Sequence, residues 1–253
     1  MEINDQIDKE EVVKEFDKRA LNSSGIDAVL DASGSADASF SNIYRDFITK
    51  YYLAKYVHAK KNEVLLDYGC GIGRISNIFS PKCQQVYATD ISKEMINKAI
   101  EINSKPNIDY FELTHLDNKI KDHSIDKIYI CWVFQHINEN QFEEIIKMFK
   151  RKLKPQGKVI LFEQINVKSF NNKIINQRIE TTYINKFDEY GFSNILNKKI
   201  FKMPSYGLDF WKRLNKNYSV FLYLSLLVER LTINYKNKNL VYSTQIFVFT
   251  SKK

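Results

Sequence analysis

Along the chain, short runs of hydrophobic residues alternate with longer stretches in which hydrophobic and polar residues are mixed. The stretch over 139–153 is of the second kind, because Phe142, Ile146 and Phe149 fall on one helical face. Lys147 falls on the opposite face. The apolar runs have the length of buried strands, and turn residues or helix starts separate them. The predicted strands are 63–67, 86–90, 108–113, 126–131 and 158–163, with helices over 73–79, after Ser92 and over 139–153.

Strands that alternate with helices indicate an α/β fold whose parallel sheet is covered on both faces. Towards the C-terminus the pattern predicts a helix at 182–190 and strands at 193–203 and 241–250. Between these strands lies an aromatic-rich insertion at about 207–239, with a helical stretch over 210–231. At the N-terminus we expect a charged helix over 10–20, a mobile loop of small residues over 33–39, and a helix from Ser41 that leads into the first strand.

Three of the eight glycines fall in one short segment directly after the first predicted strand. Gly69, Gly71 and Gly73 alternate there with other residues. Because glycine reaches positive φ values and has no side chain to hold a ligand away, such a turn indicates a nucleotide-like ligand. Asp67 would repel a pyrophosphate but suits a ligand that carries an ammonium and a sulfonium. The spacing D-x-G-x-G-x-G also differs from the dinucleotide fingerprint G-x-G-x-x-G.

The segment 64–74 resembles motif I of the class I S-adenosylmethionine-dependent methyltransferases, and three later segments support the resemblance. The second predicted strand ends in Asp90, about 20 residues after the glycines, where a carboxylate accepts the ribose hydroxyls. Residues 126–137 are similar to the family's fourth strand and the loop that faces the transferred methyl. Residues 153–163 are similar to its turn into strand five. Four motifs in order, over roughly residues 40–165, are more specific than a lone glycine turn.

The resemblance implies a doubly wound, mostly parallel, Rossmann-like sheet of seven strands, with the last strand antiparallel. Residues 1–40 would be an N-terminal helical or lid segment, and residues 41–253 the methyltransferase domain with its insertion. S-adenosylmethionine is the implied cofactor, and the implied reaction is methyl transfer by in-line displacement. The fold and the cofactor are both expectations at this stage.

The family pattern also implies positions that contact the cofactor. Asp67 matches the carboxylate near the methionine amino group. At Thr114 the match is imperfect because no aspartate stands there, and a surface loop is an equal alternative to adenine contact. The expected cofactor set comprises Asp67, Gly69, Gly71, Gly73, Asp90, Ile91, Thr114, His115, Leu116, Cys131 and Trp132.

His136 is the candidate for acid–base catalysis, since it follows the fourth strand by a few residues and should face the sulfonium. A histidine can accept a proton near neutral pH. A hydrogen-bonded structural histidine is an equal alternative. The expected acceptor contacts are Tyr44, Arg45, Phe134 and Glu163.

The net charge of +8 is unevenly distributed. Residues 1–31 carry nine acidic and four basic side chains, whereas residues 198–253 carry eleven basic and two acidic ones. The basic part suits an acidic substrate or an anionic lipid surface, although a solvated lysine-rich surface is the simpler interpretation. The three cysteines lack C-x-x-C spacing, and the N-terminus lacks a signal pattern, so we expect a cytoplasmic protein. No apolar run is long enough to span a bilayer, so we expect at most peripheral membrane contact.

The absence of certain motifs reduces the range of expected methyl acceptors. Residues 131–134 read Cys-Trp-Val-Phe where enzymes that methylate base amino groups carry Asn/Asp-Pro-Pro-aromatic, so nucleic acid is disfavoured. The sequence has no evident ligand set for magnesium or zinc, so no metal is expected. The remaining acceptors are an oxygen or nitrogen of a small molecule, a sugar or a lipid-linked glycan. An NAD-dependent oxidoreductase and a non-catalytic S-adenosylmethionine-binding protein remain alternatives, and the oligomeric state is open.

Overall fold

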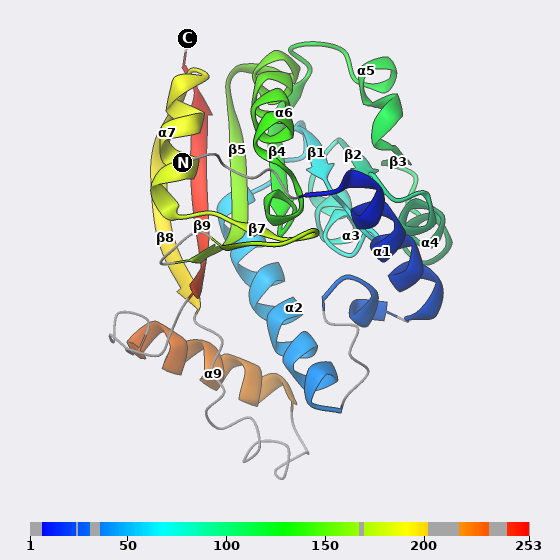
Figure 1. Cartoon of the computed structure of the whole chain (residues 1–253), viewed down its shortest axis with the longest axis vertical. Helices are drawn as coiled ribbons and strands as arrows, with labels where there is room; N and C mark the ends of the chain where they lie inside the picture. Colours follow the sequence, from blue (N-terminus) through cyan, green and yellow to red (C-terminus); the bar gives the residue numbers. More distant parts are fainter. Residues whose placement is uncertain are drawn as a thin grey trace.

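A seven-stranded sheet forms the centre of the computed structural model, which describes residues 7–23, 25–30, 36–166, 170–201, 218–232 and 242–252. The strand order is β3-β2-β1-β4-β5-β9-β8. Strands β1 to β5 pair in parallel, and β9 lies antiparallel between β5 and β8 (Figure 1). The expected doubly wound, mostly parallel fold is confirmed. The strands are β1 Val64–Tyr68, β2 Gln85–Asp90, β3 Ile108–Glu112, β4 Ile125–Cys131, β5 Leu153–Asn166, β8 Phe192–Phe201 and β9 Tyr242–Ser251.

Helices lie on both faces of this sheet (Figure 1). The α-helices are α1 Lys9–Asn22, α2 Ala36–Val57, α3 Ser76–Phe79, α4 Lys93–Asn103, α5 Leu116–Lys119, α6 Glu139–Lys152, α7 Glu180–Glu189 and α9 Tyr218–Thr232. Short 3-10 helices are η1 Gly25–Ala28, η2 Ser80–Lys82, η3 Leu113–His115 and η4 Phe134–His136. A small antiparallel hairpin, β6 Phe170–Asn171 and β7 Asn176–Gln177, follows β5. None of the described helices has the length and apolarity that crossing a membrane requires.

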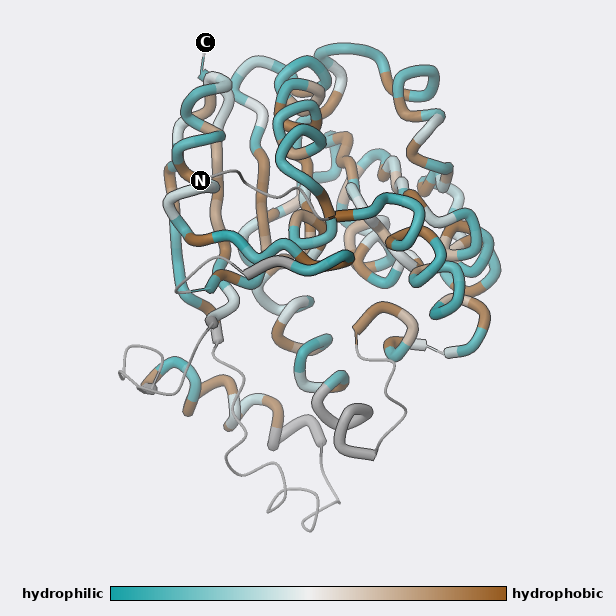
Figure 2. The backbone as a smooth tube through the Cα atoms, in the orientation of Figure 1, coloured by the Kyte–Doolittle hydropathy of each residue, from teal (hydrophilic) through white to brown (hydrophobic). Residues whose placement is uncertain are grey.

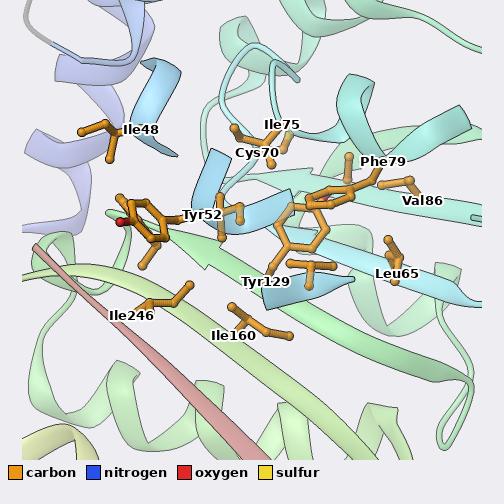
Figure 3. Close-up of a cluster of buried hydrophobic side chains, with 14 of the residues drawn as sticks. Ile48, Tyr52, Leu65, Cys70, Ile75, Phe79, Val86, Tyr129, Ile160 and Ile246 are labelled. Carbon is orange, nitrogen blue, oxygen red and sulfur yellow. The ribbon is translucent and has the colours of Figure 1, made fainter. Parts of the chain in front are cut away.

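Two hydrophobic clusters fill the two faces of the sheet. Successive residues of one strand point to opposite faces, so Leu65 belongs to one cluster and Leu66 to the other. Figure 3 shows the first cluster, in which Ile48 and Tyr52 of α2 lie over strand residues such as Ile160. The second cluster packs side chains of α5, α6 and α7 against the opposite face. Both faces are therefore buried, as the continuous apolar runs of the strands predict.

Helix α6 illustrates how local sequence sets an element's bounds. The Asn138 side chain accepts a hydrogen bond from the Gln141 N–H at 2.8 Å, and the Gln141 side chain accepts one from the Asn138 N–H at 3.1 Å. This reciprocal pair satisfies two backbone donors that a helix N-terminus leaves open. The last turn carries basic side chains, which suit the negative end of the helix dipole.

Two expected elements differ from the structure, and a third is only partly described. The loop expected over 33–39 is wrong for 36–39, which begin α2; residues 33–35 lie outside the described residues. The helix expected over 73–79 starts only at Ser76. Of the insertion at 207–239, the structure describes the helix α9, and the flanking parts lie outside the described residues. The hairpin β6–β7 was not expected.

Candidate functional site

A cavity of about 420 Å³ lies at the carboxyl ends of the strands, where the strand order reverses between β1 and β4. Open α/β sheets bind their ligands at such a switch point. The turn after β1, the end of β2 and the loop after β4 form one side of the cavity, and α1, the two residues after η1 and the β6–β7 hairpin contribute the others. The expected site residues in its wall are Arg45, Asp67, Gly69, Gly71, Asp90, Ile91, Cys131, Trp132 and His136.

The turn after β1 requires glycine. Gly69, Gly71 and Gly73 have φ values of 76°, 52° and 76°. A Cβ atom on Gly69 would lie 2.2 Å from a methyl carbon of Val133, and one on Gly73 would lie 2.3 Å from the Tyr110 hydroxyl oxygen. Gly69 and Gly71 line the cavity, whereas Gly73 does not. The turn therefore presents bare backbone to any ligand in the cavity.

Asp67, near the end of β1, is a buried carboxyl group in the cavity wall. Its side chain accepts a hydrogen bond from Ser76 Oγ at 2.5 Å. Burial raises the pKa of Asp67 to about 7; Asp90 adds to the rise, while the Ser76 hydrogen bond and Arg74 oppose it. Because desolvation penalises the anion, a cationic ligand group at this point would stabilise the ionised carboxylate.

Asp90, the last residue of β2, faces the same cavity. Its Oδ2 accepts a hydrogen bond from the Gly71 N–H at 2.8 Å, and its Oδ1 accepts one from the Ser92 N–H at 3.0 Å. Burial raises its pKa, and these backbone hydrogen bonds partly oppose the rise. The two bonds orient the carboxylate, and each oxygen retains a further lone pair that can accept from a ligand hydroxyl.

Helix α1 is anchored beside the cavity by contacts with α4. Ser92 Oγ donates a hydrogen bond to Asp17 Oδ1 at 2.5 Å. Lys98 Nζ donates another to the Ala20 carbonyl at 2.5 Å. We call α1 and the β6–β7 hairpin the roof of the cavity, because both contribute side chains to its wall. The α1 residues in the wall are Val12, Phe16 and Arg19.

His136, at the end of η4, also lies in the wall. Its Nδ1 is 2.7 Å from the Ile174 carbonyl oxygen, and since a carbonyl can only accept, Nδ1 carries the proton. Nε2 lies 3.2 Å from the Gln135 side-chain amide and is then its acceptor. The Phe16 ring meets the imidazole edge-on, with 5.1 Å between ring centroids. Burial lowers the pKa of His136 to about 4, so the ring is neutral at neutral pH.

Arg178 joins the end of the hairpin to the loop that carries His136. Its guanidinium donates hydrogen bonds to the carbonyl oxygens of Phe134 and Ile137, the latter at 2.8 Å. It also donates to Glu139 Oε1 at 2.7 Å. The side chain is buried among these partners. Because its backbone acceptors lie on either side of His136 in the chain, Arg178 fixes the loop that positions the imidazole.

Replacing Arg178 with lysine is expected to lower the free energy of unfolding by about 2 kcal/mol, because lysine keeps the charge but cannot reach three acceptors as a planar fork. Urea denaturation followed by tryptophan fluorescence measures the change. Arg151→Lys is the matched control, since Arg151 forms solvent-screened bridges to Asp117 and Asp122 and little loss is expected there. Equal losses in the two variants would contradict this role for Arg178.

Two residues expected at the acceptor are sealed in the interior instead. Phe134 is fully buried and packs edge-on against Phe142, with 4.9 Å between ring centroids. Glu163 is also fully buried, and its Oε1 accepts hydrogen bonds from the N–H groups of Val133 and Phe134 at 2.8 and 3.0 Å. Burial raises the pKa of Glu163 to about 7. The expectation that Phe134 and Glu163 face the acceptor does not agree with these positions.

Other expected residues also lie outside the cavity wall. Tyr44 is buried in the first hydrophobic cluster, although its neighbour Arg45 reaches the cavity. Thr114, His115 and Leu116 form η3 and the start of α5, and the cavity is lined instead by the preceding residue, Leu113. Their predicted contact with adenine is therefore not supported by the shape of the cavity.

The cavity also contains residues that the sequence analysis did not single out. Gln164 of β5, Gln177 of the hairpin and Thr244 of β9 bring neutral hydrogen-bonding groups to one part of the wall. The alternation of side chains along β5 could have identified Gln164. Gln164 follows Glu163, so the two side chains point to opposite faces of the sheet. The hairpin carries no such signal, because residues 170–178 have no regular period.

Residues 66–161 match the methyltransferase domain family. Phosphoethanolamine N-methyltransferase 1 of Triticum aestivum is 29% identical over 115 residues, which are 44% of this chain and 23% of the relative. N-terminal Xaa-Pro-Lys N-methyltransferase 1 of Danio rerio is 26% identical over 144 residues, 55% of this chain and 64% of the relative. The chain thus spans less than two thirds of the length of either relative.

A solved structure shares the fold over most of the chain. It is the phosphoethanolamine N-methyltransferase 2 of Haemonchus contortus, in complex with phosphomonomethylethanolamine and S-adenosylhomocysteine. The TM-score is 0.61 and the identity 15%, with 91% of this chain and 61% of that chain covered. At this identity the likeness shows the fold alone.

Proposed function

We infer that this chain, which contains an S-adenosylmethionine-dependent methyltransferase domain over residues 66–161, transfers a methyl group to an oxygen or nitrogen of a small molecule, a sugar or a lipid-linked glycan. The observation that carries this proposal is a pair of carboxylates, buried Asp67 and half-buried Asp90, on either side of a turn that requires glycine. When bound, the cofactor supplies an electrophilic methyl group on a sulfonium.

The residues around the turn fit that cofactor. Asp67 would bind its ammonium group, because a cation relieves the cost of ionising a buried carboxyl. Asp90 would accept both ribose hydroxyls through the lone pairs that Gly71 and Ser92 leave unused. Cys131 and Trp132 would form the wall near the transferred methyl. The Cys131 thiol stays protonated, since burial raises its pKa to about 12, and so it does not compete as a nucleophile.

A small polar acceptor suits the remaining part of the cavity. His136, Gln164, Gln177 and Thr244 offer neutral hydrogen-bonding groups there. Among the described residues, α1 and the β6–β7 hairpin cover part of the cavity, which favours an acceptor small enough to fit beneath them. The relatives' names include both phosphoethanolamine and a protein N-terminus, so our choice of a small acceptor rests on the roof.

His136 would orient the acceptor and receive its proton. A neutral imidazole with Nδ1 protonated presents Nε2 as an acceptor, and the Gln135 amide would give way to a hydroxyl or amine of the substrate. A hydroxyl oxygen becomes strongly acidic once it is methylated, so even a weak base can accept its proton at that stage. An amine acceptor would leave as an ammonium, and His136 would then only orient it. Alignment of the nucleophile with the methyl group supplies the larger part of the acceleration.

Isothermal titration of the purified protein with S-adenosylmethionine and S-adenosylhomocysteine tests the proposal, with NAD as the control ligand. We expect both sulfur ligands to bind and NAD not to bind. A preference for NAD would overturn the proposal in favour of an oxidoreductase. If the cofactor binds but its labelled methyl group reaches no acceptor in a broad screen of small molecules, sugars and lipid-linked glycans, the non-catalytic alternative stands instead.

The affinity for S-adenosylmethionine is expected to rise with pH through about 7, the pKa of Asp67. The ionised carboxylate binds the ammonium, and the protonated form, which dominates below that pKa, does not. The dissociation constant should therefore increase by up to about tenfold for each pH unit below 7. Titrations between mildly acidic and mildly alkaline pH measure this slope. In Asp67→Asn the slope should vanish, and a slope that persists unchanged would remove Asp67 as its source.

A further inference from the structure

Helix α9 carries an apolar face that is largely exposed, although Tyr223 at its start also meets the Phe47 ring of α2 edge-on. Tyr223, Leu224, Leu227, Val228 and Leu231 recur at helical spacing, with exposed fractions of 58%, 43%, 52%, 57% and 77%. Clustered exposure of this kind marks a contact surface, whereas isolated exposed apolar residues are ordinary. In the described part of the chain, the other exposed large hydrophobic residues are scattered over α1, α4 and β8: Leu21, Ile100, Ile102 and Ile195.

The opposite face of α9 holds the helix against the body of the protein. Leu226 is buried in the first hydrophobic cluster, and α9 contacts both α2 and β8. Arg230 donates a hydrogen bond to the Tyr51 hydroxyl of α2 at 2.7 Å. Figure 2 shows hydrophobic positions along α9, which lies beyond the edge of the sheet beside α2. The apolar face is therefore presented outward by a helix that is already packed.

The part of the sequence that contains this helix carries a large excess of positive charge. Residues 212–238 contain six basic residues and one acidic residue, Glu229, which is buried. Among described side chains, Arg230 on α9 and Lys198 and Lys199 on β8 are exposed. A second copy that paired through the same face would bring like charges together, which disfavours self-association. An anionic surface complements both the charge and the apolar face.

We propose that α9 docks this protein on an anionic lipid bilayer. The helix lies in the plane of the interface, with its apolar face among the upper acyl chains and Arg230, Lys198 and Lys199 against the headgroups. A helix of 15 residues is too short to span the hydrocarbon core. The docking does not depend on methyl transfer, and it brings the protein to the lipid phase whatever its acceptor is.

Flotation with vesicles tests this proposal. We expect the full chain to bind vesicles of equal parts phosphatidylcholine and phosphatidylglycerol, to bind phosphatidylcholine alone much less, and to lose binding at high salt. The variant Leu224→Ser/Leu227→Ser/Leu231→Ser should lower the partition coefficient at least about tenfold. The control, Ile100→Ser/Ile102→Ser on α4, removes two other exposed apolar groups and should change nothing.

A second variant separates the charge contribution from folding. Lys198→Glu/Lys199→Glu leaves α9 intact and should lower partition onto the phosphatidylglycerol vesicles at least about fivefold. Circular dichroism and S-adenosylmethionine binding check that each variant is folded. Failure of the parent protein to bind these vesicles would overturn the proposal. So would light scattering that shows a dimer which the α9 variant dissociates, because the face would then be an interface between copies.

Discussion

Replacing Asp90 with alanine is expected to weaken S-adenosylmethionine binding at least about 100-fold. In the proposed complex the carboxylate accepts two hydroxyl hydrogen bonds, and each hydrogen bond to a charged group contributes about 1.5–3 kcal/mol. The substitution also removes the acceptor of the Gly71 and Ser92 N–H groups, so the turn loses its brace. Isothermal titration measures the affinity, and S-adenosylhomocysteine should show the same loss because it carries the same ribose.

Two companion variants isolate the cause of that loss. Asp90→Asn retains an oxygen that can brace the turn but removes the charge, so its loss should be smaller than that of Asp90→Ala. Asp109→Ala removes a partly exposed carboxylate on the neighbouring strand β3, which pairs with Lys119 and lies outside the cavity wall. That control should bind like the parent protein. Unchanged affinity in both Asp90 variants would mean that the ribose lies elsewhere.

Replacing Gly69 with alanine is expected to lower the free energy of unfolding by about 4 kcal/mol. An alanine at a φ of 76° is strained, which costs about 1–3 kcal/mol. The new Cβ would also lie 2.2 Å from a Val133 methyl carbon, so overpacking adds about 1–3 kcal/mol. Urea denaturation gives the free energy directly.

The two causes can be measured separately. Gly25→Ala places alanine at a φ of 55° where a Cβ meets nothing within 4 Å, so it should show the backbone cost alone. Gly69→Ala/Val133→Ala removes the crowding partner and should recover part of the loss. Equal destabilisation in Gly25→Ala and Gly69→Ala would mean that Val133 yields freely and that crowding is not the reason for glycine at this position.

The sheet follows from the sequence because its strands are buried on both faces. Leu65 and Leu66 are adjacent and both fully buried, so the strand reads as an unbroken apolar run with a recognisable length. The glycine turn can also be predicted from the sequence, because few residue types other than glycine adopt a positive φ. Asp67 and Asp90 were placed in the cavity by their distance from that turn, and the structure has both in the wall.

What the sequence could not predict depends on local backbone and on distant contacts. Trp132 has a φ of 56°, which breaks the alternation after β4 and precedes the turn that takes Phe134 into the core. No simple propensity rule anticipates a left-handed tryptophan. Helix α1 reaches the cavity through contacts with α4 and the hairpin, which lie far away in the sequence. The roof is thus formed by tertiary contacts, and no local sequence pattern predicts it.

The position of β9 bears on how the polypeptide reaches its native state on the ribosome. It follows both β5 and β8 in the chain yet lies between them. While it is being synthesised, the two earlier strands expose unpaired backbone edges that can capture other nascent chains. Completion of the sheet therefore waits for β9, which either inserts between β5 and β8 or first pairs with β8 as a hairpin that adds to β5. A translational pause before residue 242 would leave a near-complete but aggregation-prone intermediate.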